Sequence, residues 1–311
     1  MNLAKERKGV PVKDLLYIRG TRLYVHLDGP SSAPALLYLH GGPGTGSYDF
    51  EVFQQARLTR QIRLVTLDQR GVLRSDPLNS EDPFSLQDLI EDCEAVRHEL
   101  GLSQWFVLGH SFGGYLATRY ATTYPEAVQG LIFENPTFDI GLTARSLLQA
   151  AAGEFSALGD EINAERCLAF ISQDHTPRKV WQAFIELGRA LGPQRNALYV
   201  HGPEKDFFEQ LAEQSPFPVE YWKRGEIHQQ RLAEEGQMFH SVLSDLVHLK
   251  QPTLLIKGKY DAVTSDEELA HFQQEVKASQ VLLYEESSHF VHVEEPQKYA
   301  EAICQFLLTR N

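Results

Sequence analysis

The segment Gly109-His110-Ser111-Phe112-Gly113 places a serine between two glycines, after an apolar run and before a helical pattern. Trp105–Leu108 is typical of a short buried strand, and Tyr115–Tyr124 is typical of a helix that ends at Pro125. A serine at such a junction lies on a sharp, strained turn, where a β-carbon on either flanking glycine would collide with its surroundings. The pattern predicts that Ser111 is the nucleophile of a serine hydrolase.

A serine hydroxyl attacks a carbonyl when a base removes its proton, and that base needs an orienting acid. In proteins with this turn the chain order is serine, acid, histidine. Asp261 follows the apolar run Thr253–Lys257, and His289 follows the run that ends near Tyr284. Both lie after expected strands and in the required order. We therefore predict that Ser111, Asp261 and His289 form a catalytic triad.

Two other residues near these positions have alternative interpretations. Glu134 ends the apolar run Leu131–Phe133 and could orient the histidine in place of Asp261. His292 lies three residues after His289, a spacing that could serve a metal, but no further ligands are evident. We expect His292 to begin the final helix and predict no metal site. No dinucleotide- or phosphate-binding glycine pattern is present, so we predict no cofactor.

Acyl transfer also needs N–H donors for the oxyanion that develops on the substrate carbonyl. The first expected donor is the backbone N–H of Phe112, directly after the nucleophile. The second is expected from the glycine turn His40–Gly44, with Gly42 favoured over Gly41. His40 is expected to brace this turn.

The elements that must position these residues alternate between strands and helices. A helix is predicted over Leu86–Leu100, with Ser85 as its N-cap and Gly101 as its stop. Short continuous apolar strands separated by helices indicate a mostly parallel sheet with helices on both faces. Eight strands are expected, near residues 15–18, 22–27, 35–39, 62–67, 105–108, 131–133, 252–256 and 281–284.

The alternation stops between the sixth and seventh expected strands, where the sequence is helical and polar. We predict a core of residues 1–136 and 247–311, interrupted by a helical cap of residues 137–246. Ligands of parallel sheets bind at the carboxyl ends of the strands, so a cap that leaves after the sixth strand can cover the site.

Bulk properties narrow the class of protein. The 311 residues carry a net charge of −13, which argues against nucleic acid as a partner. The three cysteines show neither metal-binding nor redox spacing, and we expect them to be buried apolar residues. Met1–Lys8 lacks the apolar stretch of a secretory signal, and no window reaches the length of a membrane span. A cytoplasmic protein with no membrane partner is expected.

Three motifs together resemble one group of the α/β-hydrolase superfamily. His40-Gly41-Gly42-Pro43-Gly44, Asp68-Gln69-Arg70-Gly71 and the serine segment, extended to Gly114, resemble the proline iminopeptidase (prolyl aminopeptidase) group of serine peptidases. Members remove an N-terminal residue, often proline, from peptides. The resemblance implies the α/β-hydrolase fold, the triad named above, and Gly42 and Phe112 as the oxyanion hole.

An aminopeptidase must also bind a free α-ammonium group, which requires carboxylates near the nucleophile. Some members carry a glutamate directly after the triad aspartate, where this chain has Ala262, and Phe112 stands where tryptophan is frequent. His201–Glu204 is similar to a cap motif whose glutamate binds the amine, with the spacing displaced by one residue. Glu204 and Glu134 are therefore the candidate substrate-binding residues.

Three functions fit these observations. The first is a serine aminopeptidase that releases N-terminal proline or a small apolar residue from short peptides through an acyl-enzyme. The second is an esterase, lactonase or amidase with the same triad, acting on small acyl substrates and favoured by Ala262. The third is a ligand-binding homologue without catalysis, since a fold does not by itself determine function.

Overall fold

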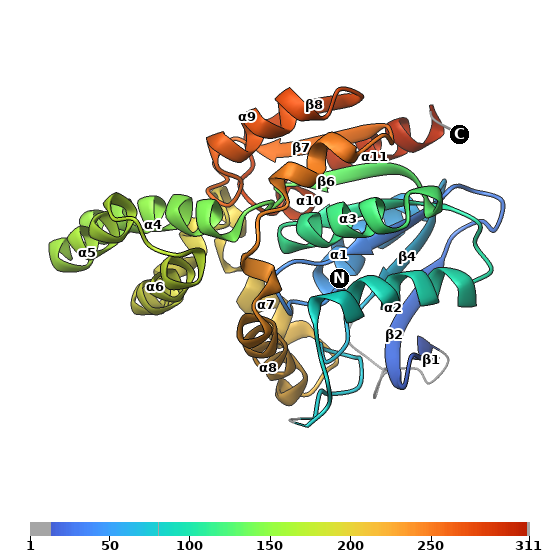
Figure 1. Ribbon diagram of the computed structural model, residues 1–311, viewed down its shortest axis with the longest axis horizontal. Coiled ribbons are helices and arrows are strands. Elements are labelled where there is room, and N and C mark those ends of the chain that lie inside the picture. The colour runs from blue at the N-terminus through green and yellow to red at the C-terminus, as the bar shows by residue number, and fades with distance from the viewer. Residues whose placement is uncertain (1–13, 80, 310–311) are drawn as a thin grey trace.

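The computed structural model describes residues 14–79 and 81–309. The predicted absence of a secretory signal concerns Met1–Lys8, which lie outside the described residues. A single sheet organises the chain (Figure 1). Its strands are β1 (Leu15–Ile18), β2 (Thr21–Asp28), β3 (Ala35–Leu39), β4 (Arg63–Leu67), β5 (Trp105–His110), β6 (Val128–Glu134), β7 (Thr253–Gly258) and β8 (Ser279–Tyr284).

The eight strands have the order β1-β2-β4-β3-β5-β6-β7-β8. β1 pairs with β2 and β2 with β4 in antiparallel fashion, and all pairs from β4 to β8 are parallel. This arrangement confirms the predicted α/β-hydrolase fold with its mostly parallel sheet. The carboxyl ends of β5, β6 and β7 are neighbours, so residues that follow these strands lie at one edge of the sheet.

Helices cover both faces of the sheet (Figure 1). Helix α3 begins at Phe112, three residues before the predicted start, because the serine turn passes directly into the helix. Ser85 caps α2 with a capping box, as the sequence predicts for an N-cap. The helices of this part are α1 (Tyr48–Leu58), α2 (Leu86–Glu99), α3 (Phe112–Thr123), α9 (Asp266–Glu275), α10 (Val291–Glu294) and α11 (Pro296–Leu308), with the 3-10 turn η2 (Pro125–Ala127).

Side chains of β3 show how the core is divided. Leu37 and Leu39 pack into the cluster that includes α2 and α3, whereas Leu36 and Tyr38 pack into the cluster that includes α1 and α11. Successive side chains of a strand point to opposite faces, so a strand that is apolar throughout is buried on both. The continuous apolar runs in the sequence are explained by this double burial.

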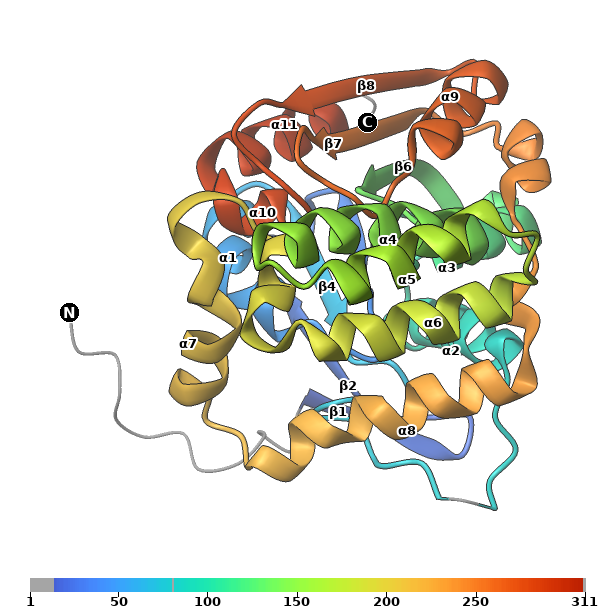
Figure 2. The same ribbon diagram turned by 90° about the vertical axis from the view of Figure 1, so that its left-hand side faces the viewer.

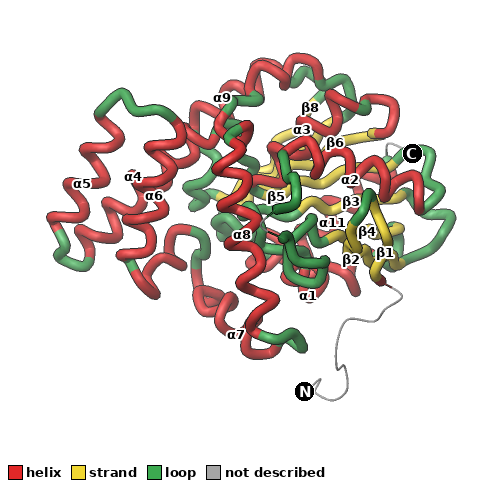
Figure 3. Tube along the Cα trace, turned by 60° about the horizontal axis from the view of Figure 1, so that its bottom comes forward, coloured by secondary structure: helices red, strands yellow, loops and turns green. Residues whose placement is uncertain are grey.

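The chain between β6 and β7 is helical and lies to one side of the sheet (Figures 1 and 3). Figure 2 shows α4, α5, α6 and α8 in front of the sheet. Part of this region has its own apolar cluster, built mainly from α4, α5 and α6. The elements are α4 (Ile140–Ala157), α5 (Glu161–Ser172), α6 (Pro177–Ala190), η3 (Gly192–Leu198), η4 (Gly202–Asp206), α7 (Phe207–Gln214), α8 (Val219–Glu235), η5 (Gln237–Phe239) and η6 (Leu243–His248).

We refer to residues 137–246 as the cap, and the division at those boundaries stays a proposal. The helix α8 contacts the loop after β4: Arg224 donates to the carbonyl of Leu73, and His228 Nδ1 lies 2.8 Å from the carbonyl oxygen of Arg70. In the described part of the chain, no helix combines the length and apolarity needed to cross a membrane. Cys93, Cys167 and Cys304 are buried free thiols.

Candidate active site

Ser111 lies at the junction of β5 and α3 with φ 56° and ψ −124°, a backbone conformation that residues with a side chain rarely adopt. A β-carbon on Gly109 would lie 2.2 Å from the carbonyl oxygen of Gly113, and one on Gly113 would lie 2.0 Å from that of Leu39. Both glycines are therefore required by close backbone contacts. The N–H of Ser111 donates to the carbonyl of Glu134 at 3.0 Å, which ties the turn to β6.

The structure brings His289 and Asp261 together, although 28 residues separate them in sequence. His289 Nδ1 lies 2.8 Å from Asp261 Oδ1, and both side chains are buried. The ring of His289 also packs beside that of His110, the residue before Ser111, at 4.6 Å between ring centres. With Nδ1 donating to the carboxylate, Nε2 is the nitrogen left to accept a proton. Among the described residues, no hydrogen bond joins Ser111 Oγ to the His289 ring.

Asp261 accepts hydrogen bonds on both carboxylate oxygens. Oδ1 accepts from the N–H of Val263, and Oδ2 accepts from the N–H of Thr264 and from the ammonium of Lys257. Burial disfavours the ionised acid, but the charge of Lys257 and the bond from His289 outweigh it and hold the pKa of Asp261 well below its usual range. The carboxylate is thus ionised and fixed in orientation.

Asn135 holds the loop that carries His289. Its Nδ2 donates to the carbonyls of Ser288 and His289, each at 2.9 Å, and its Oδ1 accepts from the N–H of Gly258. All three contacts are buried, and Asn135 itself has φ 42°. His110 Nε2 contacts the same His289 carbonyl at 3.0 Å. The ends of β5, β6 and β7 therefore all contribute to the position of His289.

The glycine turn after β3 lies beside the nucleophile. A β-carbon on Gly41 would lie 2.6 Å from Cβ of Ser111, so the backbone of the turn approaches the serine directly. Gly42 has φ 110°. Phe112 begins α3, where an N–H has no partner within the helix. These positions are compatible with the predicted donors Gly42 and Phe112, whose role in an oxyanion hole stays a prediction.

His40 connects the glycine turn to the loop after β4. Its Nε2 accepts from the N–H of Gln69, and the Gln69 side chain donates to the His40 carbonyl. An Nε2 that accepts requires the proton on Nδ1, which then donates to the carbonyl of Gly41 at 3.0 Å. Burial lowers the pKa of His40, which favours this neutral form. The interpretation of His40 as a brace follows directly from these contacts.

Asp68 and Arg74 form a buried ion pair beneath the same turn. Arg74 Nε donates to Asp68 Oδ2 at 2.6 Å, and Asp68 Oδ1 accepts from the N–H and the hydroxyl of Ser47. Glu51 gives Arg74 a second carboxylate. The Asp68-Gln69-Arg70-Gly71 motif therefore holds the glycine turn through two sets of hydrogen bonds. Asp68 accepts from Ser47, and Gln69 is bonded to His40.

Glu134 has a different place from the one expected for a substrate-binding carboxylate. It is 0% exposed, and it accepts bonds from the N–H and Nδ1 of His292 and from the hydroxyl of Tyr299. Because its carboxylate is buried and occupied, the structure corrects the expectation that Glu134 contacts a substrate amine. It also corrects the alternative in which Glu134 orients the histidine, since the partner of His289 is Asp261. His292 belongs to the short helix α10 and not to α11.

The pair of Glu134 and His292 is ionised despite its burial. Burial opposes each charge, but their mutual attraction lowers the pKa of Glu134 to about 2 and raises that of His292 to about 10. Together with His110 they offer three possible metal ligands whose atoms lie within 4.8 Å of one another. In this structure those groups are hydrogen bonded to each other and to the His289 carbonyl.

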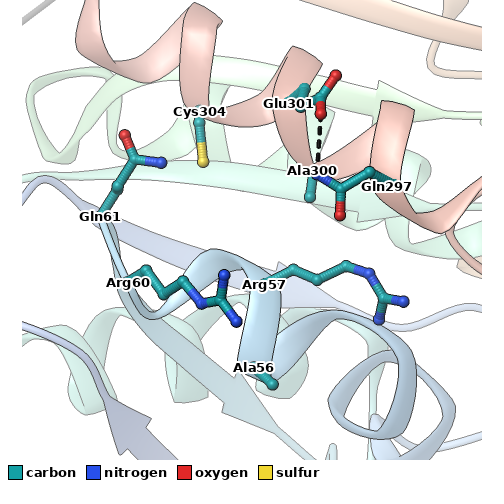
Figure 4. Close-up of a pocket in the computed structure, with 8 residues that line it drawn as sticks. All are labelled: Ala56, Arg57, Arg60, Gln61, Gln297, Ala300, Glu301 and Cys304. Atoms are coloured by element: carbon teal, nitrogen blue, oxygen red, sulfur yellow. Dashed lines mark hydrogen bonds between the residues drawn. The ribbon is translucent and has the colours of Figure 1, made fainter.

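Glu204 lies in η4 and is partly exposed. It makes no ion pair within residues 14–79 and 81–309. A groove of about 390 Å³ lies elsewhere, between α1 and α11, and none of the predicted site residues lines it (Figure 4). Its lining residues are Ala56, Arg57, Arg60, Gln61, Gln297, Ala300, Glu301 and Cys304.

Comparison with known proteins agrees with this fold. Residues 34–296 match the family described as alpha/beta hydrolase fold. A proline iminopeptidase of Saccharolobus solfataricus is 28% identical over 292 residues, which cover 88% of this chain and 84% of the relative. The crystal structure of a proline iminopeptidase-related protein from Thermus thermophilus covers 96% of this chain and 98% of its own, with 22% identity and a TM-score of 0.74. An esterase from Exiguobacterium antarcticum covers 94% of this chain and 98% of its own, with 20% identity and a TM-score of 0.67.

The chain belongs to the α/β-hydrolase fold family, and it is a serine hydrolase enzyme similar to proline iminopeptidases. Sequence reasoning missed Lys257 and Asn135. Lys257 offered a signal, because a lysine inside an otherwise apolar strand is unusual. Asn135 offered none, since its partners lie far away in the sequence.

Proposed function

We propose that this enzyme is a serine aminopeptidase that releases proline or a small apolar residue from the N-terminus of short peptides. The observation that carries the proposal is the bond between His289 and Asp261 beside the strained turn of Ser111. The full-length similarity to proteins named proline iminopeptidases supports the substrate class.

In the proposed mechanism, His289 Nε2 takes the proton from Ser111 Oγ as this oxygen attacks the substrate carbonyl. The N–H groups of Gly42 and Phe112 stabilise the oxyanion, and losing one such donor costs about a hundred- to a thousandfold in rate. His289 then gives its proton to the leaving amine, and the serine ester remains. A water molecule, deprotonated by the same imidazole, releases the free amino acid. Asp261 stays ionised throughout and orients the ring.

Ser111→Ala tests the nucleophile. Hydrolysis of a proline arylamide should fall at least a thousandfold, and labelling by a fluorophosphonate should disappear. Ser172→Ala is the matched control, because Ser172 is an exposed cap residue whose hydroxyl donates to the carbonyl of Ala169. A wild-type protein that resists labelling at neutral pH would contradict the catalytic role and favour the ligand-binding alternative.

Glu204 is the remaining candidate for recognition of the substrate amine. Glu204→Gln should raise KM for the proline arylamide about tenfold or more, and it should leave the hydrolysis of p-nitrophenyl esters, which lack an amine, unchanged. Glu213→Gln, at an exposed position of α7, serves as the control. Equal effects of the two substitutions on KM would show that Glu204 does not bind the substrate amine.

One observation favours the second candidate, an esterase. Ala262, which follows Asp261, packs against the apolar cluster of the cap, and the neighbouring Val263 is buried in that cluster. The site is therefore apolar where an amine-binding carboxylate is found in some proline iminopeptidases. A panel of aminoacyl arylamides and p-nitrophenyl esters separates the two functions, since an esterase would ignore every arylamide.

A further inference from the structure

Lys257 is a charged residue in an otherwise apolar strand. It is the fifth residue of β7, whose run is Thr-Leu-Leu-Ile-Lys-Gly, and it is only 6% exposed. Lysines are almost never buried unless they are paired. The partner here is Asp261, the residue proposed to orient the histidine.

The ammonium of Lys257 is fully used in contacts with the turn that ends at Asp261. Nζ lies 2.7 Å from Asp261 Oδ2, 2.7 Å from the Asp261 carbonyl oxygen and 3.3 Å from the carbonyl oxygen of Gly258. An ammonium has three N–H donors, and three acceptors are present. All three N–H groups of Lys257 are therefore bonded within this turn, and none is left to bind a substrate.

The same contact divides the carboxylate into two halves. Oδ1 faces His289 and Val263, while Oδ2 faces Lys257 and Thr264. Each half is held by one backbone N–H and one side chain. Loss of Lys257 would leave Oδ2 with one donor, and the carboxylate could rotate away from the geometry that aligns the imidazole.

We propose that Lys257 is a positioning residue that acts through Asp261, fixing the carboxylate toward His289. This inference rests on the proposed function, because it refines the role of the Asp261–His289 pair.

The test substitutes Lys257→Met and measures kcat and KM. We expect kcat to fall about tenfold with KM little changed, because the imidazole loses its fixed orientation while substrate binding does not involve Lys257. Lys257→Gln keeps two N–H donors for Asp261, so it should show a smaller loss of kcat. It also replaces the methionine variant if that protein does not fold.

Lys259→Met is the matched control, because Lys259 lies in the same turn, is half exposed and pairs with Glu285. Its kcat and KM should equal those of the wild type. A Lys257→Met variant that loses thermal stability but keeps the wild-type kcat would overturn the proposal.

A second readout does not depend on turnover. The proton shared by His289 Nδ1 and Asp261 should give a downfield NMR resonance, assigned by its loss in Asp261→Ala. In Lys257→Met this resonance should shift or broaden, because the carboxylate no longer holds one orientation, and an unchanged resonance contradicts the proposal. If the wild type hydrolyses neither arylamides nor esters, the proposed function fails, but this resonance still reports the effect of Lys257.

Discussion

A β-carbon on Gly225 would lie 2.1 Å from the carbonyl oxygen of Gly44, so helix α8 and the turn after β3 meet backbone to backbone. Gly44 belongs to the glycine turn that approaches Ser111, and Gly225 belongs to the cap. The position of the cap and the position of the proposed oxyanion turn are therefore linked by a contact that tolerates no side chain.

Gly225→Ala should displace the turn and lower kcat by about tenfold or more, because an oxyanion donor must be held close to its place. The overpacked contact should also cost about 1–3 kcal/mol in the free energy of unfolding. Gly153→Ala is the control: a β-carbon there meets nothing within 4 Å, and alanine in a helix is about as stable or up to 1 kcal/mol more stable than glycine. Steady-state kinetics and urea unfolding measure both effects. A Gly225→Ala enzyme with wild-type kcat would show that the contact with the cap does not position the turn.

Asn135→Gly removes the bonds to the carbonyls of Ser288 and His289 but accepts the positive φ without strain. We expect kcat to fall about tenfold while KM changes little, because His289 loses one of its supports. Asn135→Ala should lower kcat similarly and be about 1–2 kcal/mol less stable than the glycine variant, because alanine is strained at this φ. Unchanged kcat in the glycine variant would show that Asn135 serves stability alone.

The ion pair of Glu134 and His292 makes the free energy of unfolding depend on pH in both the acidic and the alkaline range. The pKa of Glu134 falls on folding to about 2, so its contribution is present above about 4.5 and is lost as pH falls toward 2. The pKa of His292 rises to about 10, so its contribution is present below about 6.5 and is lost as pH rises toward 10. The pair therefore stabilises most between these limits.

The free energy of unfolding should accordingly decrease from pH 7 to pH 10, with a slope from this residue of at most about 1.4 kcal/mol per pH unit. In His292→Gln that part of the decrease should vanish. His240→Gln, at an exposed position, should leave it intact. Urea unfolding at several pH values provides the comparison, and equal slopes in both variants would contradict the ion pair.

Glu294 joins the cap to the loop of His289, because it accepts from the N–H groups of His201 and Ser288. Burial raises its pKa to about 7, so its contribution to stability is greatest below about 4.5 and is lost as pH rises through 7. Glu294→Gln does not titrate, and its free energy of unfolding should change less between pH 4.5 and 7 than that of the wild type. Glu286→Gln, at an exposed position, should behave as the wild type. A Glu294→Gln protein with the wild-type slope in this range would argue against the raised pKa.

Much of the fold could be predicted from local sequence. Most strands are apolar runs, and the cap is an interval without such runs, so periodicity indicated the strands, their sequence along the chain and the inserted helices, but not the order of the strands in the sheet. The start of α3 was predicted three residues late, because Phe112 and the two following glycines do not show helical periodicity. The glycine at position 109 has a local reason, because a β-carbon there would meet the carbonyl of Gly113, whereas Gly113 is required by the carbonyl of Leu39 in β3.

The sequence by itself determined the turn of Ser111, because its glycines and its flanking strand and helix are neighbours in the chain. It also determined the chain order of serine, acid and histidine, because each of these residues directly follows an apolar run. Only the tertiary structure decided that His289 pairs with Asp261, that Glu134 is buried against His292, and that Lys257 fills the far side of the carboxylate. Such choices depend on which carboxyl ends of strands become neighbours. They also depend on which oppositely charged group lies beside each buried charge. Neither property produces a periodic pattern in the sequence.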